Sequence, residues 1–106
     1  MRLRRHKFAA VRTVVDGITF PSKREAARWR ELKLLERAGA ITRLERGTRW
    51  PIVVNEVLVC EYWPDAEYRE GGILVVEDTK GFRNPLYKLK AKLMQAVHGI
   101  TIREIK

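Results

Sequence analysis

The segment WPDAEYREGGILVVEDTKG, residues 63–81, predicts two adjacent strands joined by a tight turn. Residues 73–80 (ILVVEDTK) begin with an apolar, β-branched run, which is typical of a central and largely buried strand. Gly71-Gly72 predicts the turn that joins this strand to an earlier one, running from Asp65 to Arg69. We therefore expect a hairpin near the centre of a sheet.

Beyond this hairpin, the sequence predicts strands in four further ranges: 13–20, 41–54, 56–63 and 100–105. Asp16-Gly17 lies between two β-branched runs and indicates that the first range is itself a hairpin. Gly47 and Pro51 are expected to break the second range into one or two strands, since both residues disrupt pairing.

Two helices are expected between these strands. The first begins after Ser22 and runs to about Ala38; the second is capped by Asn84 and stops at Gly99. Four apolar residues at helical spacing predict the inward face of the second helix: Leu86, Leu89, Leu93 and Val97. Because a helix separates the last two strands, we expect them to be parallel. The order predicts an α/β fold with a central mixed sheet flanked by two helices.

The length, composition and net charge of the chain favour a single folded domain with a polyanionic partner. The chain has 106 residues, which predicts one domain over residues 1–106, and its 45% hydrophobic content favours a folded chain. Lys plus Arg is 22 and Asp plus Glu is 13, a net charge of +9. Such an excess favours a polyanionic partner, because neutralised phosphates release condensed counterions. The alternative interpretation is a charge that serves solubility alone.

Cysteine, histidine and hydropathy exclude several other classes. The single cysteine, Cys60, cannot form an intramolecular disulfide, which favours a reducing compartment. His6 and His98 do not provide zinc-ligand spacing. No stretch approaches the roughly 20 apolar residues that span a bilayer, and the basic N-terminus lacks an apolar signal region. A cytosolic protein without a membrane partner is expected.

Three side chains suggest hydrolytic chemistry. Asp78 and Lys80 are two residues apart on one strand, so they point to the same face, and the turn brings Asp65 beside them. Mg²⁺ prefers oxygen ligands and usually takes one or two carboxylates, with water and substrate phosphate. A nearby lysine stabilises charge that develops on the phosphate. The pattern predicts a Mg²⁺ or Mn²⁺ site for phosphodiester hydrolysis.

The same side chains also have structural interpretations. Asp78 and Lys80 could form an exposed ion pair, and Asp65 after Pro64 could be a turn residue. Glu77 faces away from Asp78 by alternation, which gives it a supporting or structural role. A bulge in the strand would instead let Glu77 replace Asp78 as the ligand.

Pro64-Asp65, twelve intervening residues and Asp78-Thr79-Lys80 resemble the signature of the PD-(D/E)XK, or restriction-endonuclease-like, nucleases. The flanking order of helix, three strands, helix and strand resembles the core of that superfamily. From about residue 11 onward, the chain is also similar to a family of small phage and prophage endonuclease-like proteins. The segments that carry this similarity are TVVDGITFPSKREAARWRELKLLERAGAI, VVEDTKGF and PLYKLKAKL.

The resemblance implies a restriction-endonuclease-like core and a role for each site residue. Asp65 and Asp78 would be metal ligands, joined by the backbone carbonyl of Thr79. Lys80 would position or activate the attacking water. Glu25 matches a first-helix glutamate that holds a metal-bound water or a second metal. Glu25 also fits the capping-box position of the first helix, and from the sequence alone both roles stay open.

Seven basic residues are expected to contact DNA phosphates: Arg2, Arg4, Arg5, Lys7, Arg83, Lys88 and Lys92. The first four lie in a basic arm, residues 1–12, while Lys88 and Lys92 lie one turn apart on the second helix, with Lys90 nearby. An ordinary solvated helix face is the alternative. Three tryptophans are expected in the core rather than against unpaired bases: Trp29, Trp50 and Trp63.

These observations predict a metal-dependent DNA endonuclease that selects DNA structure rather than sequence. The resemblance implies a phage or prophage protein that acts in recombination or DNA processing in the bacterial cytoplasm. One domain carries one site, so cutting both strands would take a homodimer or two successive nicks. The alternative is a non-catalytic nucleic-acid-binding module with the same fold, which would not need Asp65, Asp78 and Lys80. A third interpretation is a subunit that docks on a larger phage complex.

Overall fold

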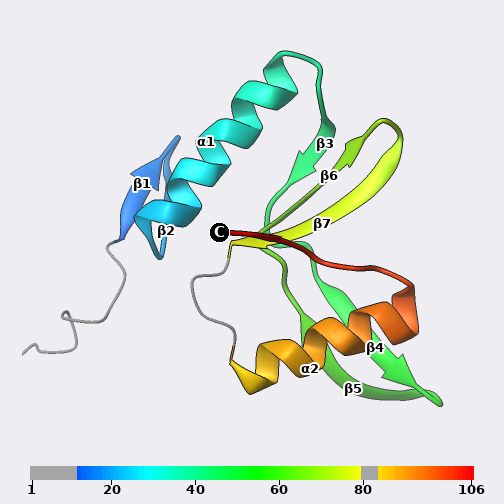
Figure 1. Ribbon diagram of the computed structural model, residues 1–106. Helices are drawn as coiled ribbons and strands as arrows, with labels where there is room; N and C mark the ends of the chain where they lie inside the picture. The colour runs from blue at the N-terminus through cyan, green and yellow to red at the C-terminus, as the bar shows by residue number, and fades with distance from the viewer. Residues whose placement is uncertain (1–11, 80–83) are drawn as a thin grey trace, which may run out of the picture.

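The computed structural model describes residues 12–79 and 84–106 (Figure 1). The elements are β1 (Thr13–Val15), β2 (Ile18–Phe20), α1 (Lys23–Arg37), β3 (Thr42–Glu45), β4 (Trp50–Val54), β5 (Val57–Tyr62), β6 (Ala66–Glu70), β7 (Ile73–Thr79), α2 (Pro85–Leu93), the π-helical turn η2 (Met94–His98) and β8 (Arg103–Ile105). Six of the residues predicted to act on DNA lie outside the described residues: Arg2, Arg4, Arg5, Lys7, Lys80 and Arg83.

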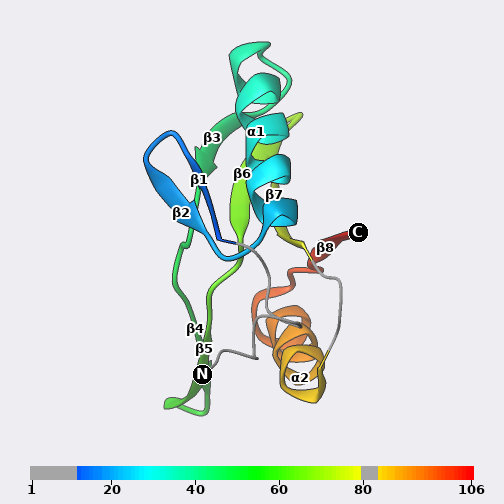
Figure 2. The same cartoon turned by 90° about the vertical axis from the view of Figure 1, so that its left-hand side faces the viewer.

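A four-stranded mixed sheet has the strand order β3-β6-β7-β8. The pairs β3–β6 and β6–β7 are antiparallel, and β7–β8 is parallel, as expected for two strands joined through a helix. Strand β7 is an inner strand and is buried from Val75 to Thr79, which confirms its predicted central position. The pairs β1–β2 and β4–β5 form separate two-stranded ribbons. In both views, the β4–β5 ribbon lies at the end of the molecule away from α1 (Figures 1 and 2).

The two helices cover opposite faces of the sheet. Successive side chains of β7 point to opposite sides, so the contacts of Val75 and Val76 show which helix covers each face. Val75 belongs to one buried cluster with Trp29 of α1. Val76 belongs to a second cluster with Tyr87 of α2 and Met94 of η2. Strands β6 and β7 run between the helices in Figure 1. An α/β fold with a mixed sheet and two flanking helices is therefore confirmed.

Local signals set the first hairpin and the first helix as predicted. Asp16 and Gly17 have φ values of 52° and 77°, the left-handed pair that a tight hairpin turn requires. The Ser22 hydroxyl accepts a hydrogen bond from the Glu25 amide at 3.1 Å and caps α1. Gly39 follows the helix with φ 82°, a conformation that glycine adopts without steric cost.

Pro51 does not break the chain where the sequence predicted a break. It lies inside β4, whereas the interruption between β3 and β4 falls at residues 46–49, which confirms the predicted break near Gly47. A proline is tolerated in this position because β4 belongs to a two-stranded ribbon, where one edge of each strand makes no ladder bonds. The Pro51 carbonyl lies 2.7 Å from Nε2 of His98, which links the ribbon to η2.

The predicted inward face of α2 is wrong. Leu86 and Leu89 are 61% and 54% exposed, and of the predicted stripe Leu93 alone packs, partly buried, on the core. The buried residues of this segment are Tyr87 and Met94. The two candidate stripes are offset by one residue, about 100° around the helix, and both contain apolar residues. Packing on the sheet, which the periodicity does not encode, decides between them.

Candidate active site

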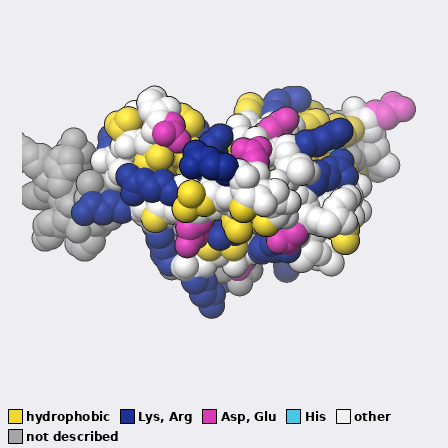
Figure 3. All heavy atoms as spheres, turned by 90° about the horizontal axis from the view of Figure 1, so that it is seen from above, with side chains coloured by type: hydrophobic (Ala, Val, Ile, Leu, Met, Phe, Trp, Pro, Cys, Tyr) yellow, Lys and Arg dark blue, Asp and Glu magenta, His cyan; other side chains and the backbone are white. Residues whose placement is uncertain are grey.

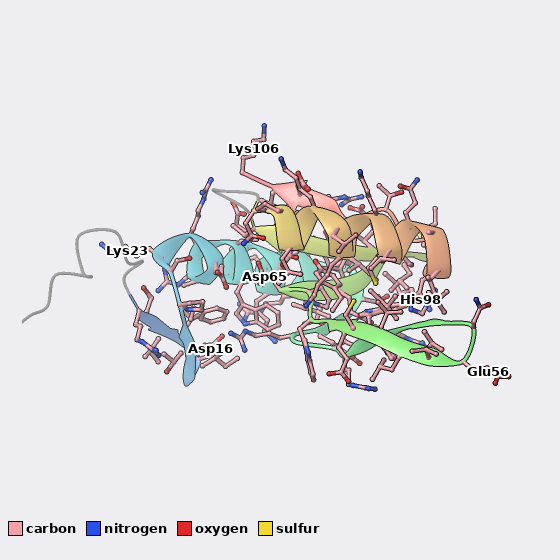
Figure 4. All side chains as sticks on the ribbon, turned by 90° about the horizontal axis from the view of Figure 1, so that it is seen from below. Asp16, Lys23, Glu56, Asp65, His98 and Lys106 are labelled. Atoms are coloured by element: carbon pink, nitrogen blue, oxygen red, sulfur yellow. The ribbon has the colours of Figure 1, made fainter. Side chains whose placement is uncertain are left out.

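Two aspartates meet where β6 begins and β7 ends. Ala66 pairs with Glu77, so the next position outward brings Asp65 level with Asp78. The Asp65 amide donates to Oδ1 of Asp78 at 3.0 Å, and the Thr79 amide donates to Oδ2 of Asp65 at 2.8 Å. Each carboxylate thus accepts a bond from the opposite backbone. Figure 4 shows Asp65 between the two helices in the middle of the molecule.

Asp78 is 1% exposed and is also bound by a tyrosine. The Tyr62 hydroxyl, at the end of β5, donates a hydrogen bond to Oδ2 of Asp78. Burial of Tyr62 and the nearby charge of Asp78 raise the pKa of the phenol well above its usual range. The hydroxyl therefore remains protonated and continues to act as a donor. Such donors offset the free-energy cost of burying the Asp78 carboxylate.

Asp65 and Asp78 both line an open groove of about 250 Å³ on the α2 side of the sheet. The remaining lining residues are Tyr62, Trp63, Asn84, Leu86, Tyr87 and Lys90. Among the described residues, Lys90 provides the positive charge in this groove, whereas the sequence pattern had favoured its neighbours Lys88 and Lys92. Lys88 and Lys92 line a separate hollow with Glu104. Lys90 lies three residues after the buried Tyr87, so both side chains are on the same side of α2. With the inward face assigned correctly, this spacing would have predicted Lys90 as the groove lysine.

A second hollow of about 110 Å³ lies on the other face, between α1 and the sheet. Glu25, Asp65 and Thr79 line it, together with Glu77 and Trp29. Of these two hollows, Asp65 lines both, Glu25 lines the one beside α1, and Asp78 lines the groove. The side chains of Glu25 and Asp78 therefore lie on opposite faces of the sheet, whereas the predicted Thr79 ligand is a backbone carbonyl, which the alternation of side chains along β7 does not assign to either face.

Glu77 is held by a buried ion pair rather than facing the groove. The Arg28 side chain donates from Nε to Oε2 and from Nη2 to Oε1, both at 2.9 Å, and the Tyr68 hydroxyl donates to Oε1 at 2.6 Å. Hydrogen bonding to Glu77 raises the pKa of Arg28 further, so the guanidinium remains charged. Both oxygens of Glu77 are occupied, and of the two candidate ligands Asp78 is the one in the groove. Sequence reasoning missed Arg28, although a carboxylate in an apolar strand signals that a partner is needed.

The donors in the groove suit a hard cation. Within residues 12–79 and 84–106, no group of three or more His, Cys, Asp or Glu side chains is gathered as a ready metal site. Two carboxylates are adjacent, and Oδ1 of Asp65 has no partner among those residues. Oxygen donors from one or two carboxylates fit Mg²⁺ or Mn²⁺, which complete their shells with water and phosphate.

The three tryptophans have different environments. Trp29 is buried in the α1 cluster, and Trp50 is half-buried, with its indole N–H donating to Oε1 of Glu67 at 2.8 Å. The expectation that tryptophans belong to the core is wrong for Trp63, which is 55% exposed at the edge of the groove.

The family described as "Protein of unknown function (DUF1064)" matches residues 5–105. The chain belongs to the DUF1064 family. The match includes every described helix and strand and both aspartates of the groove. Comparison with curated proteins and with solved structures gave no match. Within the described part of this DUF1064 protein, no helix is both long and apolar enough to cross a membrane.

Proposed function

We propose that this DUF1064 protein is a metal-dependent DNA endonuclease that hydrolyses phosphodiester bonds. The observation that carries the proposal is the meeting of Asp65 and Asp78 across β6 and β7, at an open groove that also contains Lys90. Like charges directly opposite on neighbouring strands are unfavourable. A divalent cation would offset that repulsion, and the groove leaves room for a substrate phosphate beside it.

Asp65, Asp78 and the backbone carbonyl of Thr79 are the groups that would hold Mg²⁺ or Mn²⁺. When bound, the ion acidifies water and stabilises negative charge on the phosphate. Lys90 would bind a phosphate oxygen, and Lys80, directly after Thr79 in the sequence, would position the attacking water. Glu25 shares its hollow with Asp65, so its influence would reach the groove through that residue.

The topology supports a restriction-endonuclease-like core. An antiparallel β6–β7 hairpin carries both aspartates, and a helix then leads to the parallel strand β8. Pro64-Asp65 and Asp78-Thr79 fall at the strand ends that flank the groove, and Lys80 follows them in the sequence. Because the sequence also resembles small phage and prophage endonuclease-like proteins, the proposal includes a phage or prophage origin, action in the bacterial cytoplasm, and a role in DNA recombination or processing.

DNA as the partner is supported by charge. The net charge is +9, and Figure 3 shows Lys and Arg side chains spread over one face rather than gathered in a single patch. Contacts of that kind bind phosphates without reading bases, which favours recognition of DNA structure. Because the described residues bring Asp65 and Asp78 together at one groove, a double-strand cut would take a homodimer or two nicks.

The test is cleavage by the purified protein. Linear, nicked, single-stranded and four-way-junction DNA are incubated with Mg²⁺, Mn²⁺ or EDTA, and products are separated on a gel. We expect metal-dependent cutting of at least one substrate. Asp65→Asn and Asp78→Asn should each lower the rate about 100-fold or more, since a lost ligand forfeits several kcal/mol of charge stabilisation.

Glu70→Gln is the matched control, because Glu70 is an exposed carboxylate at the other end of β6 and should leave cutting unchanged. Asp65→Asn is the milder site variant, since its amide oxygen can still accept the Thr79 N–H. Folding of each variant is checked by urea unfolding. Salt-sensitive DNA binding without cutting by the unmodified protein would favour the non-catalytic binding module instead.

A further inference from the structure

Trp63 is exposed although both of its neighbours are buried. Tyr62 is 4% exposed, and Pro64 is among the fully buried side chains. Trp63 lies in the short connection between β5 and β6, directly before the proline. Proline fixes its own φ angle and restricts the residue before it to extended conformations. The backbone at Trp63 is thus held from both sides while its indole ring faces outward.

The indole of Trp63 has no packing role comparable to that of the other two tryptophans. Trp29 contacts Phe20, and Trp50 contacts His98, with ring centroids 6.2 Å and 5.1 Å apart. For Trp63, neither an aromatic ring nor a cation lies over the indole among the described residues. Tryptophan is on average highly buried in proteins, whereas Trp63 is 55% exposed and lines the groove together with the exposed Leu86, so the two side chains form an apolar surface beside the aspartates.

Trp63 lies close to the aspartates at which we propose that the phosphodiester bond is cut. It lines the same groove as Asp65, Asp78 and Lys90. Trp63 and Asp65 are two residues apart, so their Cα atoms are at most about 7 Å from each other. Adjacent bases along a duplex strand are about 3.4 Å apart. A base against Trp63 would therefore belong to a nucleotide within about two steps of the phosphate held at the aspartates.

We infer that Trp63 is a stacking platform for an unpaired base, and that the substrates are DNAs with single-stranded nucleotides at the cleavage point. In an intact duplex, each base is covered by its neighbours and offers no free face to an indole. In a single strand, bulge, flap or junction, a base can leave the stack and lie on the exposed ring. This inference rests on the proposed function, whose substrate class it specifies.

The test measures binding in EDTA, so it does not depend on cutting. Fluorescence anisotropy titrations use a single-stranded 20-mer, a 20-base-pair duplex, and the same duplex with one bulged 2-aminopurine. For the unmodified protein we expect tighter binding of the single strand and the bulge than of the duplex. The 2-aminopurine emission should be quenched when the base stacks on the indole.

Trp63→Ala should weaken binding of the single strand and the bulge about 5- to 150-fold, the range expected for loss of one stacked base. Duplex binding should stay within about twofold, and Trp63→Phe should recover part of the loss. Ile73→Ala is the control, since Ile73 is 70% exposed at the far end of β7, away from the groove. Urea unfolding midpoints should be the same for all variants, because both side chains are exposed.

Two results of the binding titrations would overturn the inference. One is an equal loss of duplex and single-strand affinity in Trp63→Ala, and the other is no loss of either. Failure of the proposed function has a different signature: the stacking effect is present in EDTA, but no substrate is cut with Mg²⁺ or Mn²⁺. Cutting of intact duplex at the same rate as bulged DNA would retain the nuclease proposal and reject the role of Trp63.

Discussion

Asp78 illustrates how single residues establish the groove. It is a fully buried carboxylate, and it accepts bonds from the Tyr62 hydroxyl and the Asp65 amide. Tyr62 is the last residue of β5 and Asp65 directly precedes β6. The Asp78 side chain therefore connects β7 to the β4–β5 ribbon and to the start of β6. The position of Asp78 therefore depends on groups that must retain their protons.

This dependence on Tyr62 predicts a loss of stability at high pH. The pKa of Tyr62 is raised by burial and by Asp78, so the folded chain retains a proton that the unfolded chain releases from about pH 10 upward. Above that pH the unfolded state binds fewer protons, and stability falls by up to about 1.4 kcal/mol per pH unit for this group. Urea unfolding between pH 9 and 11 measures the slope, which should be less steep in Tyr62→Phe. An unchanged slope in that variant would contradict the assignment.

Arg28 and Glu77 predict a second effect at the residue scale. Arg28→Met would leave Glu77, which is 1% exposed, without its charge partner, and should lower the free energy of unfolding by about 3–5 kcal/mol. Arg28→Met combined with Glu77→Met should regain most of that loss, because no buried charge then remains. Urea unfolding of both variants checks this, and equal stability of the single and double variants would count against it.

Residue alternation along the strands was enough to place Asp65 beside Asp78 and Glu77 on the other face. It could not find Arg28, which is 49 residues from Glu77 in the sequence, or assign Lys90 to the groove. Those contacts depend on how helices dock on the sheet, and the spacing of side chains within one element carries no information about docking.

At the scale of elements, both helices begin at their predicted caps and most of the strands lie in their predicted ranges, although Pro51 does not end a strand and the last turn of the second helix is π-helical. Ser22, Asn84 and the glycine turns set the boundaries, since caps and left-handed residues act locally. The orientation of α2 was not predictable in this way. Its apolar residues fit two faces, and tertiary packing selected the face with Tyr87 and Met94.

The orientation of α2 predicts opposite effects for two apolar side chains. Met94→Ala should cost about 2–5 kcal/mol, because Met94 is 0% exposed and truncation leaves a cavity. Leu89→Ala should change stability by about 0.5 kcal/mol or less, since Leu89 is exposed on the helix surface. Chemical denaturation of both variants compares them directly. Equal losses would show that Leu89 is part of the core.

The cap of α1 predicts a smaller change. Ser22→Ala removes the hydroxyl that accepts the Glu25 amide, which should cost about 1 kcal/mol. For a domain of this size, that loss lowers Tm by roughly 4–8 °C. Ser22→Asp, which retains an acceptor at the same position, should leave Tm close to that of the unmodified protein in a thermal melt followed by circular dichroism.

For the whole molecule, net charge predicts how salt affects DNA binding. If Lys88 and Lys92 contact phosphates, Lys88→Gln and Lys92→Gln should each reduce the slope of log affinity against log salt by about 0.9. Lys33→Gln is the control, because Lys33 already pairs with Glu36 on α1 at 3.6 Å. Titrations at 50–200 mM salt measure the slopes. Unchanged slopes in the α2 variants would mean that their exposed face does not meet DNA.

Asp65 borders both hollows, so one carboxylate stands between the two sides of the sheet. The hollow beside Trp29, at about 110 Å³, approaches the size of cavities that accept a single aromatic ring. A fragment lodged there would press on the same aspartate that faces the opposite groove. An inhibitor of the proposed cleavage could therefore act from behind the sheet, without competing with nucleic acid and with no dependence of its potency on DNA concentration.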